Sequence, residues 1–119
     1  MDAADAVEFI PDIGDNRDLE NGEQVWCELL PMTGEELRSY QRTMAGVKPG
    51  SPQALKKAEI VVKRIVSERV LVLHNYSDIK GEPISDGASL FDRGEPAMVD
   101  EIYDALTSIS KLKAGARKN

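Results

Sequence analysis

The chain has little of the side-chain chemistry that most enzymes and metal sites need. Its 119 residues include one cysteine, Cys27, and one histidine, His74. One cysteine cannot form an intramolecular disulfide, and a lone thiol suits a reducing compartment. Zinc needs three or four convergent ligands, and a Cys–His nucleophile needs a third, orienting group that the pattern lacks. We therefore expect no enzyme, with Cys27 a small buried side chain and His74 a turn residue.

Long apolar runs and an excess of positive charge are also absent. No segment approaches the roughly 18 consecutive apolar residues of a membrane-spanning helix, and the N-terminus lacks the basic and apolar parts of a signal peptide. Nucleic-acid binding needs clustered cations, whereas 15 Lys and Arg stand against 21 Asp and Glu. The glycines stand singly, without a phosphate-binding loop. The sequence therefore predicts a cytosolic protein that binds no cofactor, membrane or nucleic acid.

The composition is that of a small soluble domain. Hydrophobic residues make up 41% of the chain and charged residues 30%, which is typical of globular proteins, and the length fits one domain. Acidic residues with Pro and Gly predict an irregular arm over 1–22. A single globular domain over 23–112 and a basic tail over 113–119 should follow. The predicted fold class is α+β, predominantly helical, with one or two short strands.

The first half of the domain begins with alternating side chains. The period of two over residues 24–30 predicts a strand near 24–30, which Pro31 ends. Thr33 then offers a helix N-cap, and Glu36 completes a capping box three residues later. The sequence therefore predicts a helix over 34–45.

A longer apolar-rich segment follows. Ser51 as N-cap with Pro52 in the first turn predicts a helix over 52–73. Its end is ambiguous, because the run Val70–Leu73 is apolar at every position and periodicity does not separate a buried helix end from a short strand. We favour the helix, and a strand over 69–74 that pairs with residues 25–30 is the alternative.

The last third holds two further helices. Asp86 caps a short helical turn over 88–92 that Gly94 ends, and Pro96 opens a helix over 96–110. The polar segment before them, residues 74–84, has the Gly/Pro chemistry of a tight connection, and Asp78 in it predicts an Asx-type turn.

The apolar stripes of the two long helices are the candidate partner-binding surface. A helix that is apolar over much of its circumference is either central in the domain or partly covered by another molecule. The core interpretation and the docking interpretation both remain open at this point. The candidate contact residues are Leu55, Val62, Ile65, Val66, Val99, Ile102, Tyr103 and Leu106.

One stretch of the chain resembles a known family. Asn75-x-Ser77-Asp78-x-x-Gly81 precedes a short helix, and the final helix closes with Ser110-x-Leu112 and Lys118-Asn119. This order resembles the tail assembly chaperones of long-tailed bacteriophages and prophages. Tyr76 stands where a leucine is common in that family.

The resemblance implies a non-enzymatic assembly factor. Such proteins bind the tape measure protein and keep it soluble until tail tube protein assembles around it, and they are absent from the mature virion. The resemblance thus implies tape measure and tail tube proteins as partners, self-association, and a bacterial host cytosol. The alternatives are a small acidic adaptor or regulatory protein-binding module, and a head–tail structural component.

Overall fold

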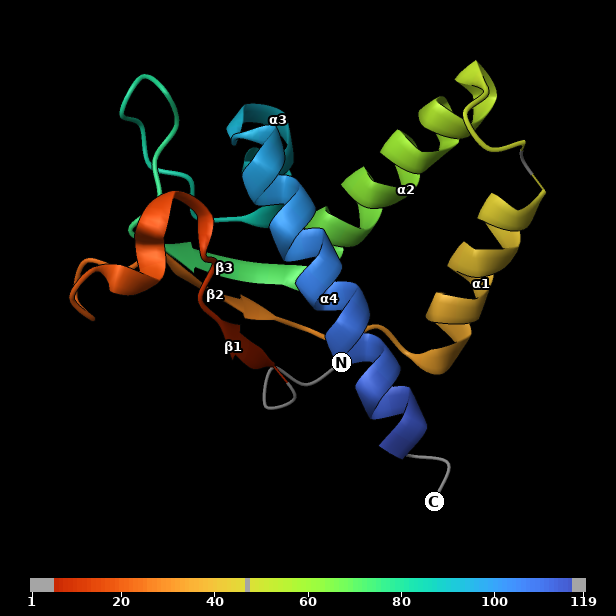
Figure 1. Ribbon diagram of the computed structural model, residues 1–119, viewed down its shortest axis with the longest axis horizontal. Helices are drawn as coiled ribbons and strands as arrows, with labels where there is room; N and C mark the ends of the chain where they lie inside the picture. Colours follow the sequence, from red (N-terminus) through yellow and green to blue (C-terminus); the bar gives the residue numbers. More distant parts are fainter. Residues whose placement is uncertain (1–5, 47, 117–119) are drawn as a thin grey trace.

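The protein folds into a mostly helical α+β domain, as predicted (Figure 1). The computed structural model describes residues 6–46 and 48–116. In chain order the elements are β1 (Val7–Phe9), the 3-10 helix η2 (Ile13–Asp18), β2 (Trp26–Leu29), α1 (Gly34–Ala45), α2 (Pro52–Arg69), β3 (Val70–His74), α3 (Gly87–Arg93) and α4 (Pro96–Ala116).

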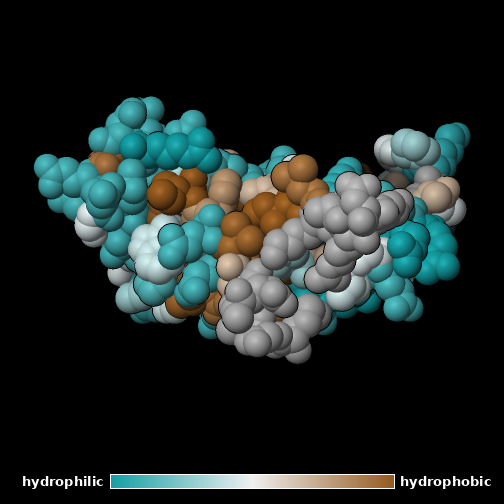
Figure 2. Space-filling view, turned by 90° about the horizontal axis from the view of Figure 1, so that it is seen from below, coloured by the Kyte–Doolittle hydropathy of each residue, from teal (hydrophilic) through white to brown (hydrophobic). Residues whose placement is uncertain are grey.

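The three strands form one antiparallel sheet in the order β1-β2-β3. Because side chains alternate between the faces of a strand, Cys27 and Leu29 lie on the core face, together with Leu73 and Val70 of β3, with which they pair respectively. Trp26 and His74 pair on the opposite face, where their rings stack with centroids 3.9 Å apart. In Figure 1, β1 is the lowest of the three strands. Figure 2 shows the molecule from below, and on that face apolar residues gather in the middle, between two hydrophilic ends.

The second helix ends earlier than predicted. It stops at Arg69, and Val70–His74 forms β3, paired with β2. The favoured prediction of a helix over 52–73 is therefore wrong at its end, and the strand alternative is correct. After Val70 donates the last helical bond to Val66 O, the backbone turns extended, and Leu73 N donates to Ser85 O at 2.9 Å on the strand's other side. As an edge strand on β2, the run buries Val70 and Leu73 in the core and pairs its backbone with β2.

The N-terminal segment is less irregular than predicted for 1–22. Residues 7–9 add the third strand, and residues 13–18 form η2. The buried side chain of Asn16 holds this segment in a regular conformation. Its amide donates to Pro11 O at 2.7 Å and to Val25 O at 2.9 Å, and it accepts from Val25 N at 2.8 Å. The Asn16 amide and the pairing of β1 with β2 thus both tie the acidic segment to the sheet. Residues 1–5 of the predicted arm lie outside the described residues.

The connection between β2 and α1 is held from two sides. The predicted capping box forms, with Glu36 N donating to Thr33 Oγ1 at 3.1 Å and Thr33 N donating to Glu36 Oε1 at 3.3 Å. Arg69, only 5% exposed, pairs with Glu36 and donates to Pro31 O at 3.4 Å. From the other side, Met32 N donates to the buried hydroxyl of Ser110 at 2.9 Å. These bonds fix α1 against both α2 and α4.

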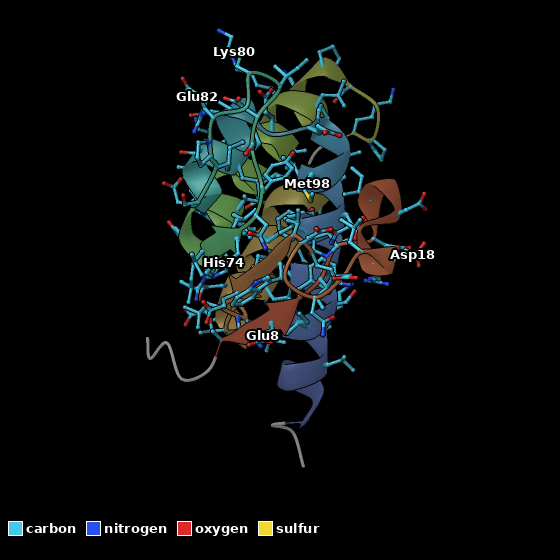
Figure 3. All side chains as sticks on the ribbon, turned by 90° about the vertical axis from the view of Figure 1, so that its left-hand side faces the viewer. Glu8, Asp18, His74, Lys80, Glu82 and Met98 are labelled. Carbon is cyan, nitrogen blue, oxygen red and sulfur yellow. The ribbon has the colours of Figure 1, made fainter. Side chains whose placement is uncertain are left out.

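The loop after β3 is a small hairpin built around Asp78. Its carboxylate accepts from Lys80 N at 2.9 Å and Glu82 N at 3.0 Å, which confirms the Asx-type turn, and Gly81 takes φ 84°. Asn75 also has a positive φ, 63°, and its amide donates to Gln24 O at 2.9 Å. The motif that carries the family resemblance therefore shapes this loop. The loop projects beyond the sheet (Figure 1), with Lys80 and Glu82 near its tip (Figure 3).

The two C-terminal helices form where they are predicted, with one difference in length. α3 spans Gly87–Arg93, and Asp86 caps it by accepting from Ser89 N at 2.7 Å. α4 begins at Pro96 but runs to Ala116 rather than ending at 110. Ser110 does not stop it, because its hydroxyl donates to Leu106 O inside the helix at 2.7 Å. Of the predicted tail over 113–119, residues 113–116 continue α4 and 117–119 lie outside the described residues.

Candidate functional site

Most of the residues predicted to contact a partner belong to the core of the domain. Ile65, Val66, Ile102 and Leu106 are at most 4% exposed and lie in the same apolar cluster as the strand residues. These four side chains therefore pack inside the domain and expose almost no surface to a partner. The reason is that α2 and α4 both pack into one core, so the domain itself uses the richest part of each apolar stripe.

The other four predicted residues are divided between two places. Tyr103 is half-buried and packs edge-on against Tyr40, with ring centroids 6.1 Å apart, so it belongs to the contact between α1 and α4. Burial raises the pKa of its phenol. Val62 and Val99 line a groove, and Leu55 is 68% exposed. The structure thus brings Val62 and Val99 together at the groove and places Tyr103 elsewhere. Val99 is only 7% exposed and also belongs to the core cluster.

A surface groove between α2, α3 and α4 contains two of the predicted residues, Val62 and Val99. Its volume is about 370 Å³. α2 forms one wall, and the end of α3 with the start of α4 forms the other. The lining residues are Ala58, Glu59, Val62, Phe91, Gly94, Pro96, Val99 and Asp100. We call this hollow the α2–α4 groove.

The turn between α3 and α4 shapes one wall of the groove. α3 ends because Gly94 leaves the helix while its N–H still bonds to Leu90 O at 2.8 Å, and Pro96 starts α4 two residues later. A Cβ on Gly94 would lie 2.5 Å from Leu90 O and 2.8 Å from Leu90 Cδ1. Glycine therefore lets the turn sit close to α3, with half-buried Phe91 beside it.

Leu55 extends the apolar lining of the groove outward along α2. Leu55, Ala58 and Val62 are spaced by three and four residues, so they share one face of the helix. At 1.5 Å per residue, Leu55 lies about 10 Å along the helix axis from Val62. Leu55 and the groove together therefore form a continuous apolar track that is open to solvent.

A second hollow adjoins the groove. It has a volume of about 370 Å³ and shares Gly94 and Pro96 with the groove. Its remaining lining residues are Tyr76, Asp78, Ile79, Arg93 and Glu95. Ile79 of the hairpin loop is fully exposed, whereas Tyr76 is buried and its hydroxyl accepts from Glu95 N at 3.0 Å. Together, the two hollows make one long surface that runs from α2 to the hairpin loop.

Neither rare side chain of the chain is placed for nucleophilic chemistry. Cys27 points into the core and His74 to the other face of the sheet, because each occupies an alternate position of paired strands. Burial, with Glu101 and Glu28 nearby, raises the pKa of the Cys27 thiol to about 12, so the thiol stays protonated at neutral pH. A Cys–His pair is thus incompatible with this sheet. His74 stacks on Trp26 at the end of β3, next to the turn.

The part of the chain that the structure describes holds no group of three or more His, Cys, Asp or Glu side chains placed to bind a metal ion. Within the same residues, no helix has the length and apolar character needed to cross a membrane.

The sequence analysis did not select Ala58, Phe91 or Pro96, which line the groove. Phe91 lies on a helix of only seven residues, too short for a periodic apolar signal. The Asp86 cap and the Gly94 stop were the available signals, because they predict the helix that places Phe91 opposite α2. Comparisons with protein-family models, curated proteins and solved structures found no match to this chain.

Proposed function

We propose that this protein is a non-catalytic binding protein that holds an apolar helical segment of a client in the α2–α4 groove. The observation that supports this proposal most is the open apolar track formed by Leu55, Ala58, Val62 and Phe91 between two helical walls. An amphipathic helix placed in a groove between helices is a common mode of peptide recognition, with anchors spaced by three and four residues.

The sequence resemblance suggests the identity of the client. In the tail assembly chaperones that this chain resembles, the client is the tape measure protein, which is long and helical. We propose the same class of client here, with tail tube protein recruited later and the chaperone left out of the mature virion. The proposed place of action is the cytosol of a bacterial host.

A groove of this size implies weak individual contacts. A segment that buries a few apolar side chains gains about 1.5–3 kcal/mol for each large one, and this gain is offset by the loss of freedom on binding. Stable coverage of a long client then requires many copies, because linked contacts raise the effective concentration. We therefore propose that copies self-associate along the client, and that the net charge of −6 keeps the assembly in solution.

The proposal predicts that Leu55→Asp combined with Ala58→Arg weakens client binding at least about tenfold, because the changes remove one apolar anchor and put charge into the track. The measurement is the soluble fraction of a tape measure fragment, from the same genome, after co-expression and centrifugation. The affinity of the purified components provides the second readout.

A matched control exists on the same helix. Ile60 is 61% exposed, close to the exposure of Leu55, but lies five residues further on and so on another face. Ile60→Asp should leave client solubility unchanged. Equal losses in Ile60→Asp and the Leu55–Ala58 variant would remove the groove from the proposal, and a fragment that stays insoluble with the unaltered protein would contradict the proposed function.

A further inference from the structure

Along the two adjoining hollows, the charged lining side chains that form no ion pair with another described residue are all acidic. Glu59 lines the groove on the α2 wall and Asp100 on the α4 wall, and Glu95 lines the second hollow. These three carboxylates form no ion pair with another described residue. A segment placed in the groove therefore meets an uncompensated carboxylate on each side.

Two cations beside these hollows, Arg93 and Lys63, already contact carboxylates. Arg93 pairs with Asp78 at 2.6 Å and with Glu82 at 3.7 Å, and it also donates to Pro83 O. Lys63 lies 3.6 Å from Asp92 and over the Phe91 ring, 5.8 Å from its centroid. Neither cation offsets the carboxylates that face the apolar track.

We propose that the groove accepts amphipathic helices that carry Lys or Arg on both flanks of the apolar face. This inference rests on the proposed function and defines the chemistry of its client. Since Glu59 and Asp100 stand on opposite walls, one cation on each flank of the client would meet one carboxylate while the apolar anchors face Val62, Phe91 and Val99. Complementary charge sets the preference between clients, and apolar contact provides the affinity.

Two synthetic helical peptides test this proposal. They share the same apolar anchors at i, i+3, i+4 and i+7, and differ only in having Lys or Glu at the flanking positions. The Lys peptide should bind the unaltered protein about tenfold more tightly, because two weak attractions replace two repulsions of similar size. The difference should shrink as salt is raised, since exposed charges are screened.

Charge reversal in the protein provides the reciprocal test. Glu59→Lys with Asp100→Lys should invert the preference, so that the Glu peptide binds more tightly. Both side chains are exposed, so the fold should tolerate the changes. The control variant, Glu8→Lys with Asp18→Lys, has the same net charge, but its exposed positions lie on β1 and η2, away from the groove (Figure 3). It should keep the original preference.

The outcomes separate this inference from the proposed function. Equal binding of the two peptides, or tighter binding of the Glu peptide to the unaltered protein, would overturn the charge preference and leave a groove that binds helices. Failure of both peptides to bind would overturn the inference and the proposed function together. Self-association that the Lys peptide displaces and Leu55→Asp abolishes would show that a second copy occupies the groove, and would overturn the proposal of a partner helix.

Discussion

Gly87→Ala should destabilise the protein by about 3 kcal/mol or more, the upper part of the range for overpacking a core. A Cβ at this position would lie 2.0 Å from Val66 O, 2.9 Å from Val66 C and 3.1 Å from Ser67 Cα. All three are backbone atoms of α2, so no side-chain rotation relieves the clash. α3 would have to move away from α2, and the buried side chain of Leu90 would lose its packing. Urea-induced unfolding followed by circular dichroism measures the change.

Gly22→Ala is the matched control for this substitution. No atom lies within 4 Å of the Cβ that it would add, so its stability should stay within about 0.5 kcal/mol of the unaltered protein. If Gly87→Ala matched Gly22→Ala in urea midpoint, the close approach of α3 to α2 described above would be wrong.

Arg69→Met should be the second severe substitution, with a loss of about 3 kcal/mol. Methionine fills much of the volume but leaves Glu36 without its cation and Pro31 O without its donor. Removing one partner of a buried pair typically costs ~3–5 kcal/mol, and the partial exposure of Glu36 to water places the expected value at the low end. The variant should also loosen α1 from α2, since Arg69 joins the two helices. Urea unfolding at pH 7 measures the loss.

The pair also makes stability depend on pH. Burial alone would raise the pKa of Glu36, but hydrogen bonds from Arg69 and Thr33 and the charge of Arg69 outweigh it, so its pKa lies below the usual 4.5. Backbone N–H groups of Glu82 and Ser89 likewise lower the pKa values of Asp78 and Asp86. These carboxylates bind fewer protons folded than unfolded below about pH 5. Their stabilisation is therefore complete at neutral pH and is lost as pH falls through the folded pKa values.

A comparison of unfolding at pH 7 and at pH 3.5 isolates the contribution of Glu36. The unaltered protein should lose stability between the two values, and Glu36→Gln and Arg69→Met should each lose less, since neither retains the ionised pair. A loss in both variants as large as in the unaltered protein would show that the pair contributes nothing to the acid sensitivity.

Local signals predicted much of the fold because local chemistry decides those elements. The Thr33–Glu36 capping box, the Asp86 cap and Pro96 each act within one helical turn, and each forms as expected. The helix predicted for Val70–Leu73 was wrong for the opposite reason, because distant residues decide the structure there. Its residues suit a helix or a strand, and the neighbouring strand β2, more than 40 residues earlier in the chain, decides between them.

The candidate site was harder to predict than the fold. The stripe from Leu55 to Val66 is continuous in sequence, yet Val66 is buried and Leu55 is exposed. The difference depends on where α3 and α4 cover α2, and these contacts join residues far apart in the chain. Asn16 shows the same limit, because nothing adjacent to it in the sequence indicates that it binds the backbone of Val25. A pattern thus identifies the apolar face of a helix, and the tertiary packing determines which part stays open.

The most direct test of the account is amide chemical-shift mapping of the ¹⁵N-labelled protein during titration with the tape measure fragment. The account predicts that the largest shifts belong to Leu55, Ala58, Glu59, Val62, Phe91, Val99 and Asp100, which form the groove and its extension along α2. Shifts concentrated instead on the outer face of the sheet, around Trp26 and His74, with the groove amides unchanged, would contradict it.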